Sequence, residues 1–270
     1  MRIAPHLLVL ITLLLIAGCA PQPVERARPA HPGFDTWRYP GTATMQTWAR
    51  TSPYQWVGYY IQSPCHRGGS WMGRRAEVEG MGPGIAALYV GQQTWDGVAE
   101  PEEQPAQIIC SRTLLTRAEG QRSGRDAVQK MASEGFPTGS TIFLNVERME
   151  RVSPEMVEYY RAWIETVIAD GRFVAGTYVH RLNAETLFTH AKQVHRAAGI
   201  QEAPPFWVAG GAGFTLNATP REVGFAFATI WQGALDVNRT WGDIQLLIDE
   251  NVSTRRNPSA PRASVAQTGG

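Results

Sequence analysis

Short apolar runs alternate with amphipathic segments through most of the chain, and this alternation is the feature that most constrains the fold. Several of the apolar runs are uninterrupted, which is typical of strands that are covered on both faces or enclosed in a barrel. Eight strands alternating with helices over about 220 residues predict a single-domain TIM-type (β/α) barrel of the α/β class. The eight expected strands span 33–35, 56–61, 85–90, 141–146, 173–179, 206–209, 225–231 and 245–248.

The segments between the strands carry helix signals. "SPE" at 153–155 supplies an N-cap, a proline at the first helical position and an acidic first turn, and Gly171 provides the stop. Two further helices are expected over 123–134 and 183–198, each followed by a glycine. Only about a dozen residues separate Trp231 from the last strand, which is too few for a crossover helix. We therefore expect the C-terminal third to be irregular and helix-poor, with short connections that include antiparallel ones.

A doubly wound open sheet is the alternative architecture. Such sheets usually carry a glycine-rich nucleotide-binding turn after the first strand, and "GFDTWRYPG" at 33–41 has no such turn. The G-x-x-x-x-G-K-[ST] phosphate loop and the G-x-S-x-G elbow of serine hydrolases are absent from the sequence as well. The sequence therefore predicts a barrel without a nucleotide cofactor.

The N-terminal residues have the composition of an export signal. A basic residue precedes an apolar stretch of about ten residues, which favours a secretory signal over a membrane span. The following "IAGC" at 16–19 resembles the bacterial lipobox, whose cysteine becomes the lipid-bearing first residue. We expect residues 1–18 to be a lipoprotein signal peptide and Cys19 to anchor the exported chain to the bacterial membrane. In a diderm cell the expected place is the periplasmic side of the outer membrane.

The remaining chain divides into a tether, one domain and a tail. Residues 19–31 are proline-rich and lack apolar periodicity, so they predict a tether. Residues 32–252 form the predicted domain, and 253–270 have the composition of a disordered tail. Removal of Arg2 with the signal leaves 24 basic residues against 24 acidic ones. A neutral chain without basic runs argues against nucleic acid as a partner.

Two cysteines remain in the domain, Cys65 and Cys110. Exported proteins fold in an oxidising compartment, so a disulfide between them is expected, and two unpaired buried thiols are the alternative. Neither cysteine has a C-x-x-C or paired-histidine context, and the histidines are scattered. The sequence therefore predicts no metal site.

Functional residues of a barrel gather where its strands end. Asp35, Glu147 and Asp249 are the carboxylates at expected strand ends, and they are our candidate catalytic residues. Carboxylates can act as acid, base or nucleophile on a glycosidic bond, aromatic rings stack on sugars, and amides bind hydroxyl groups. Each acid also has a structural alternative: a helix cap, an ion pair with a nearby arginine, or a turn. The candidate substrate-binding residues are Asn145, Tyr59, Gln92, Tyr178, Trp207, Trp231 and Gln232.

Several segments resemble a known family. "HPGFDTWRYPG" at 31–41, "ALYVGQQ" at 87–93 and "GFPTGSTIFLNVE" at 135–147 are similar to the glycoside-hydrolase-like domain of unknown function 1906. The likeness continues through "FVAGTYV" at 173–179 to "IDENV" at 248–252, and so covers nearly all of the predicted domain. It implies a TIM-type barrel similar to the family 25 lysozymes, which cleave the glycan strands of peptidoglycan. Fold similarity alone does not establish an activity.

The resemblance also implies roles for individual residues. Glu147 matches the glutamate of the family's D-x-E motif, the general acid, while Asp35 and Asp249 match carboxylates near the first and last strands. Asn145 stands where the motif has aspartate, and an amide cannot take up a proton at neutral pH. Three functions follow: a hydrolase of envelope glycan with Glu147 as acid and Asp35 as partner, a non-catalytic glycan-binding lipoprotein, or an envelope scaffold. Asn145 could alternatively orient the acetamido group of an N-acetylated sugar.

Overall fold

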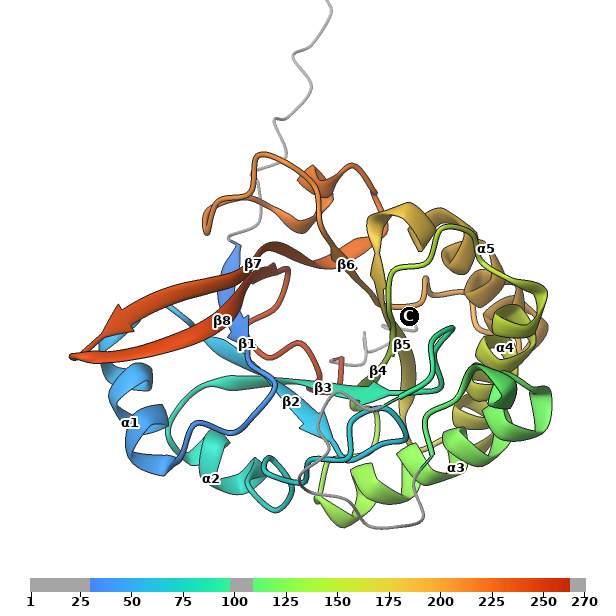
Figure 1. The fold of residues 1–270 in the computed structure, drawn as a ribbon, viewed down its shortest axis with the longest axis horizontal. Helices are drawn as coiled ribbons and strands as arrows, with labels where there is room; N and C mark the ends of the chain where they lie inside the picture. Colours follow the sequence, from blue (N-terminus) through green and yellow to red (C-terminus); the bar gives the residue numbers. More distant parts are fainter. Residues whose placement is uncertain (1–29, 98–108, 263–270) are drawn as a thin grey trace, which may run out of the picture.

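The computed structural model describes residues 30–97 and 109–262, and these form one closed barrel (Figure 1). The strands are β1 (His31–Asp35), β2 (Trp56–Ile61), β3 (Gly84–Val90), β4 (Thr141–Val146), β5 (Val174–His180), β6 (Phe206–Ala209), β7 (Ala228–Trp241) and β8 (Ile244–Ser253). The helices are α1 (Thr42–Thr51), α2 (Arg75–Gly80), α3 (Arg117–Ser133), α4 (Pro154–Asp170) and α5 (Arg181–Ala197), with short 3₁₀ turns η1 (Arg112–Leu114) and η2 (Pro220–Val223).

The strands follow one another around the barrel in sequence order. β1 to β7 run parallel, whereas β8 is antiparallel to both β7 and β1 and closes the ring between them. The predicted TIM-type α/β barrel is therefore confirmed. No long helix follows β6, and β7 returns directly into β8 as a hairpin that extends beyond the barrel (Figure 1). The expected helix-poor C-terminal third is thus confirmed too.

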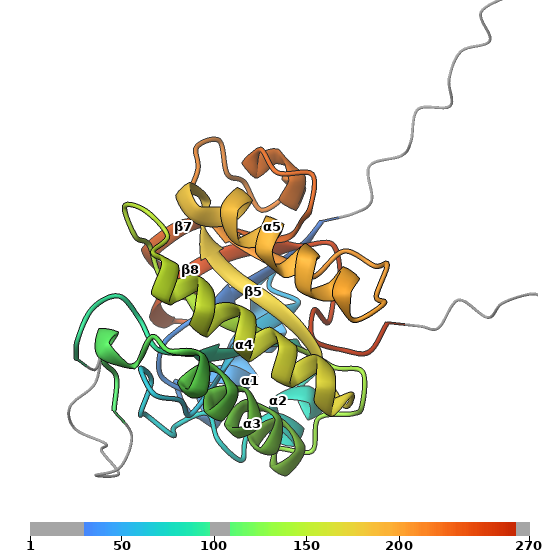
Figure 2. The same cartoon turned by 90° about the vertical axis from the view of Figure 1, so that its right-hand side faces the viewer.

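The long helices cover one side of the barrel. α3, α4 and α5 lie next to one another and run along the outer surface (Figure 2). The helix predicted at 153–155 has its first residue where the sequence placed it, since the Ser153 hydroxyl accepts a hydrogen bond from the backbone N–H of Met156. Gly171 ends that helix in the left-handed conformation, which glycine adopts without steric cost.

Aromatic rings fill the interior of the barrel. The Trp207 indole lies edge-on to the rings of Trp56, Phe143 and Tyr178, with centroid separations of 5.4, 5.8 and 5.4 Å. Space for these rings depends on a glycine, because a Cβ at Gly33 would lie only 2.1 Å from the Trp56 indole. The barrel is thus a packed core, with room for polar side chains only near its ends.

Residues 254–262 correct the sequence prediction of a disordered tail from residue 253. They pack against the end of the barrel at which β3 and β4 begin. There the backbone N–H of Ser259 donates to the carbonyl of Ile85, and the Ser259 carbonyl accepts from the N–H of Thr141. The Asn257 side chain accepts the N–H of Ile85. This segment satisfies backbone groups at the starts of β3 and β4 that would otherwise be unpaired.

The predicted disulfide is present and joins Cys65, after β2, to Cys110, before η1. The predictions for the signal peptide, for Cys19 and for most of the tether fall on residues 1–29, outside the described residues, as does the tail beyond 262. Within 30–97 and 109–262, no helix has the length and apolar character needed to cross a membrane.

Candidate active site

Asp35 and Asp249 face each other across the β1–β8 junction. The two residues are register partners in the antiparallel pair. Asp35 is the last residue of β1, whereas Asp249 lies within β8 and reaches the same end of the barrel only because β8 runs in the opposite direction. Asp35 is 2% exposed and Asp249 is partly exposed.

Three side chains donate hydrogen bonds to the Asp35 carboxylate. The Tyr60 hydroxyl lies 2.6 Å from Oδ1, and the amides of Gln232 and Asn251 lie 2.9 and 2.8 Å from Oδ2. The Gln232 amide also donates to Oδ2 of Asp249 at 3.0 Å, so one NH₂ group bridges the two carboxyls. The backbone N–H of Asp236 donates to the other oxygen of Asp249 at 2.7 Å.

A second layer of hydrogen bonds holds these two amides in place. The Tyr178 hydroxyl donates to the Gln232 carbonyl oxygen at 2.6 Å, which directs the NH₂ group of Gln232 toward the carboxyls. The Trp207 indole N–H donates to the Asn251 oxygen at 2.9 Å, with the same effect on Asn251. The aromatic core of the barrel thus sets the orientation of the polar groups above it.

Glu147 follows β4 directly and is partly exposed. Its backbone N–H donates to the side-chain oxygen of Gln93 at 3.1 Å, and the Gln93 amide donates to the backbone carbonyl of Asn145 at 3.0 Å. Gln93 therefore fixes the end of β4 on both sides of Val146. The Asn145 side chain hydrogen-bonds to the Glu147 carboxylate, while its own Oδ1 is buried and has no partner among the described residues.

The three carboxyl groups lie close enough to act on one another electrostatically. Burial raises the pKa of Glu147, the hydrogen bond from Asn145 opposes that rise, and the negative charge of Asp35 adds to it. Burial, followed by the charge of Asp35, raises the pKa of Asp249 to about 8. Burial also raises the pKa of Asp35, against its three hydrogen-bond donors. At neutral pH the site therefore retains protons that ordinary carboxyls would have released.

The structural alternatives for the acids are not realised. Glu147 forms no salt bridge with any residue in the described ranges, so it is not paired with Arg148 or Arg151. α1 begins after Gly41 without a side-chain cap, so Asp35 is not the cap of that helix. In the same ranges no group of three or more His, Cys, Asp or Glu side chains is arranged to hold a metal ion.

Of the predicted substrate-binding residues, Asn145, Tyr178 and Gln232 lie at the carboxylates, but Tyr59 and Gln92 do not. The Tyr59 side chain points outward, where its hydroxyl bonds to the Glu134 carboxylate. Gln92 donates to the carbonyl of Ile109 at 2.7 Å and thereby holds the loop after β3. Successive side chains of a strand alternate between faces, so Tyr60, the neighbour of Tyr59 on β2, points to the site instead. Gln93 follows Gln92 in the loop after β3 and contacts the backbone of Asn145 and Glu147.

The two predicted tryptophans are also placed away from any ligand surface. Trp207 is fully buried inside the barrel, so its ring cannot stack on a sugar. Trp231 is 1% exposed, packs edge-on against Phe214 and donates its N–H to the carbonyl of Gly210. Both tryptophans are structural residues, which corrects the substrate-binding role that we predicted for them.

The substrate-binding residues that we selected from the sequence leave out Tyr60, Gln93 and Asn251, which belong to the site. Asn251 carried a usable signal, because it lies two residues after Asp249 and therefore on the same face of a strand. Tyr60 and Gln93 stood beside the residues that we chose, and the alternation rule separates Tyr60 from Tyr59 only once the inward-facing positions of β2 are known.

A cavity of about 930 Å³ lies between the loops that follow β3 and β4. None of the three acids lines it; its lining begins two residues after Glu147, at Met149, and includes Thr94, Arg112, Glu150, Arg151 and Glu155. Its lining includes both charged side chains and the buried apolar residues Leu115 and Met149. A cavity of this size can accept more than one sugar unit.

Three bacterial proteins of known structure have a similar fold. An uncharacterised protein of B. stearothermophilus is 18% identical and has a TM-score of 0.57, covering 84% of this chain and 97% of its own. The spore cortex lytic enzyme SleM of Clostridium perfringens is 10% identical with a TM-score of 0.52, covering 83% and 67%. GHIP, a glycosyl hydrolase 25 of Streptococcus pneumoniae, is 12% identical with a TM-score of 0.52, covering 83% and 86%.

These identities are low, so the likeness establishes the fold alone. A comparison with curated protein sequences finds no match. The model of one family, described as the Rv2525c-like, glycoside hydrolase-like domain, matches residues 46–253, which is most of the chain. This protein has a glycoside-hydrolase-like fold that resembles peptidoglycan lytic enzymes, and it belongs to the Rv2525c-like family of glycoside hydrolase-like domains.

Proposed function

We propose that this chain is an exported, lipid-anchored protein that hydrolyses a glycan of the bacterial cell envelope, peptidoglycan or a related polysaccharide. Glu147 is the general acid and Asp35 is its partner carboxylate. The observation that carries the proposal is the meeting of Glu147, Asp35 and Asp249 at one end of the barrel. These residues are far apart in sequence, yet the fold places them where their charges raise one another's pKa values. Clusters of carboxyl groups with perturbed pKa values are common at functional sites.

Glu147 has the properties that a general acid needs. Its carboxyl group is partly exposed, its pKa is raised by burial, and no arginine or lysine of the described residues forms a salt bridge with it. A protonated Glu147 can donate its proton to the oxygen of the leaving sugar. The cavity that begins at Met149, two residues after Glu147, gives an extended glycan a place to lie along the loop that follows β4.

Asp35 acts through its charge in this proposal. Its three hydrogen-bond donors favour the ionised form and oppose the burial that raises its pKa, while the pKa of Asp249, raised to about 8, keeps that neighbour largely protonated at neutral pH. A carboxylate held in a fixed position stabilises the positive charge that develops on the sugar ring in an oxocarbenium-like transition state. The names of SleM and GHIP, which describe a lytic enzyme and a glycosyl hydrolase, support the same class of substrate.

Asn145 favours a second candidate function, binding of envelope glycan without turnover. It stands where the D-x-E motif has aspartate, and an amide cannot replace a carboxylate in proton transfer. Its buried Oδ1, which has no partner in the described part of the chain, is an acceptor that a ligand N–H or O–H group would satisfy. In this alternative the site recognises a sugar and Glu147 serves as a hydrogen-bonding group.

The experiment that separates the two functions measures release and binding together. The chain from residue 20, which retains every described residue, is incubated with purified peptidoglycan and with other polysaccharides, beside Glu147→Gln. Glu158→Gln is the matched control, because Glu158 is an exposed glutamate of α4 that does not line the cavity. Release of new reducing ends by wild type and by Glu158→Gln, with none from Glu147→Gln, supports the hydrolase.

Other outcomes favour the other functions. Binding by all three proteins without release supports the glycan-binding candidate. In that case Asn145→Asp restores the family motif, and release by that variant alone identifies Asn145 as the cause of the missing activity. Absence of both binding and release for every polysaccharide contradicts both candidates and leaves the scaffold function.

A further inference from the structure

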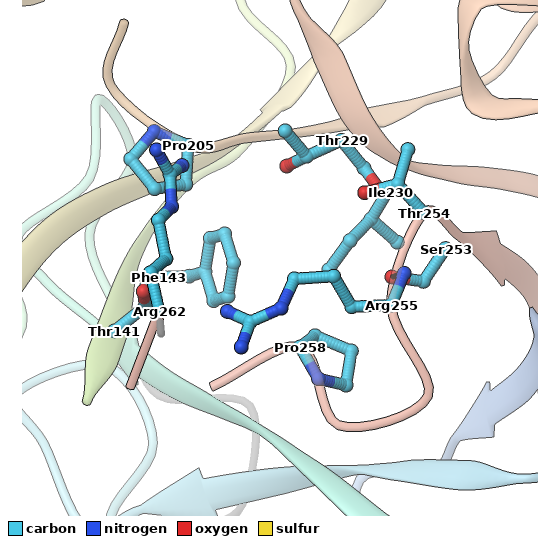
Figure 3. A pocket seen from close by; sticks show the side chains of 10 residues that line it. All are labelled: Thr141, Phe143, Pro205, Thr229, Ile230, Ser253, Thr254, Arg255, Pro258 and Arg262. Atoms are coloured by element: carbon cyan, nitrogen blue, oxygen red, sulfur yellow. Dashed lines mark hydrogen bonds between the residues drawn. The ribbon is translucent and has the colours of Figure 1, made fainter. Parts of the chain in front are cut away.

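A second cavity, of about 310 Å³, lies at the opposite end of the barrel from the carboxylates (Figure 3). It is lined by residues from the starts of β4 and β7, the end of β8 and the segment 254–262. The phenyl ring of Phe143 forms part of its inner wall, and the Arg255 side chain reaches toward its middle (Figure 3). Arg262 lies along one edge (Figure 3).

The charge in this cavity is not balanced by the residues around it. Two of its lining residues are arginines and none is an aspartate or glutamate. Neither Arg255 nor Arg262 forms a salt bridge with a residue in the described ranges. Burial, followed by the positive charge of Arg262, lowers the pKa of Arg255. Two guanidinium groups therefore repel each other in a recess where an anion would stabilise both.

Arg255 retains donors for a ligand after its contacts within the protein are made. It donates from one terminal nitrogen to the carbonyl of Ala260 at 2.7 Å and from the other to that of Pro261 at 2.9 Å. A guanidinium has five N–H groups, so these two bonds fix its orientation and leave others available. The backbone N–H of Arg255 donates to the Ser253 hydroxyl, which places that hydroxyl in the same cavity.

The cavity also lies where the chain first enters the barrel. His31, the first residue of β1, is the register partner of Ser253, a lining residue. Ala30, the described residue that precedes β1, therefore lies at this end of the barrel. The lipid anchor proposed at Cys19 is joined to the domain through this end.

From this arrangement we propose that the cavity binds a phosphate group, held by Arg255 and Arg262. Guanidinium groups bind phosphate through paired N–H···O bonds, and two of them match its multiple oxygens. The apolar walls formed by Phe143 and Pro258 leave space for an organic part of the ligand. The phosphate is either free in solution or part of an anionic lipid headgroup. The proposal is independent of the hydrolase function.

The first test measures binding of inorganic phosphate by isothermal titration calorimetry, at constant ionic strength adjusted with sodium chloride. Arg262→Gln is the main variant, because its side chain is exposed and its loss should leave the fold intact. Arg256→Gln is the matched control, since Arg256 is exposed, lies in the same segment and does not line the cavity. We expect saturable binding that Arg262→Gln weakens by about tenfold or more, and that Arg256→Gln leaves unchanged. Absence of saturable binding, or equal weakening in both variants, overturns the proposal.

The second test identifies the source of the phosphate. The chain from residue 20, which lacks the lipid-bearing cysteine, is sedimented with vesicles of phosphatidylcholine containing phosphatidylglycerol and with vesicles of phosphatidylcholine alone. Sedimentation that requires phosphatidylglycerol, is reduced by inorganic phosphate and is lost in Arg262→Gln assigns the site to a lipid headgroup. Binding of inorganic phosphate without sedimentation assigns it to a soluble phosphate compound.

Discussion

Replacement of Asp249 by asparagine should stabilise the folded chain at neutral pH. Burial and the charge of Asp35 raise the pKa of Asp249 from 3.8 to about 8 on folding. A carboxyl with a raised folded pKa contributes its full stability below the unfolded pKa and loses it as pH rises toward the folded pKa. Each pH unit in that window costs 1.36 kcal/mol for a single group. Between pH 3.8 and pH 7 the loss amounts to at most about 4 kcal/mol.

Asparagine resembles the protonated carboxyl, because it offers one carbonyl oxygen and carries no charge. The difference in unfolding free energy between Asp249→Asn and wild type should therefore grow as pH rises from about 4 to 8, and flatten outside that window. Urea unfolding at half-unit steps of pH measures the difference. Asp243→Asn is the control, because Asp243 is exposed in the β7–β8 turn at a φ of 64°, which asparagine tolerates. Parallel stability curves for wild type and Asp249→Asn would refute the electrostatic coupling between the two aspartates.

Three further changes test the positions of individual groups. Gly58→Ala should displace the Asp35 side chain, because a Cβ at Gly58 would lie 2.4 Å from Cβ of Asp35. The unfolding free energy, measured by urea unfolding, should fall by about 1–3 kcal/mol. Tyr60→Phe removes a buried hydrogen-bond donor from Asp35 and should lower the unfolding free energy by about 1–3 kcal/mol, which urea unfolding measures. Tyr59→Phe, whose hydroxyl bonds to Glu134 away from the site, should leave glycan release or binding unchanged. Cys110→Ser removes the disulfide and should lower the unfolding free energy by roughly 4 kcal/mol. Reduction of wild type with dithiothreitol should have the same effect in urea unfolding, and a much smaller loss would contradict this contribution of the disulfide.

Sequence periodicity was sufficient for the first six strands but not for the last two. β2, β4 and β6 have the bounds that the sequence predicted, since each is a largely apolar run. β7 was expected at 225–231 and instead spans Ala228–Trp241, because its second half lies in a hairpin beyond the barrel, where no apolar alternation is required. Phe225 and Phe227 mimicked a strand, but their rings pack against each other at a tilt, and Phe227 stacks on the α5 residue Phe188.

The tail was misjudged for a related reason. Its composition is polar and proline-rich, and composition records how much apolar surface a segment can bury. Residues 254–262 are held instead by backbone hydrogen bonds to the starts of the barrel strands. The need of those strand ends for partners is a property of the closed barrel, which no local pattern in the tail reveals.

The site was predictable to the level of its acids, because strand ends in a barrel are few and charged residues there stand out. Gln92 and Gln93 follow β3 in a loop, so strand alternation does not give the directions of their side chains. The choice between Tyr59 and Tyr60 depends on which face of β2 points inward. That face is fixed by the register between neighbouring strands, and in a continuously apolar run the sequence does not encode it. Asp249 was found although the rule that selected it applies to parallel strands, which β8 is not.

Because β8 alone touches both β7 and β1, the first and last strands of the ring share one partner. A growing chain that stops short of residue 244 leaves β1 and β7 with unpaired edges, the kind of surface on which strands from other molecules assemble. It also lacks Asp249 and Asn251, so the cluster around Asp35 cannot form. The acidic cluster can therefore assemble only after residues 244–251 have been synthesised and β8 has paired with both of its neighbours.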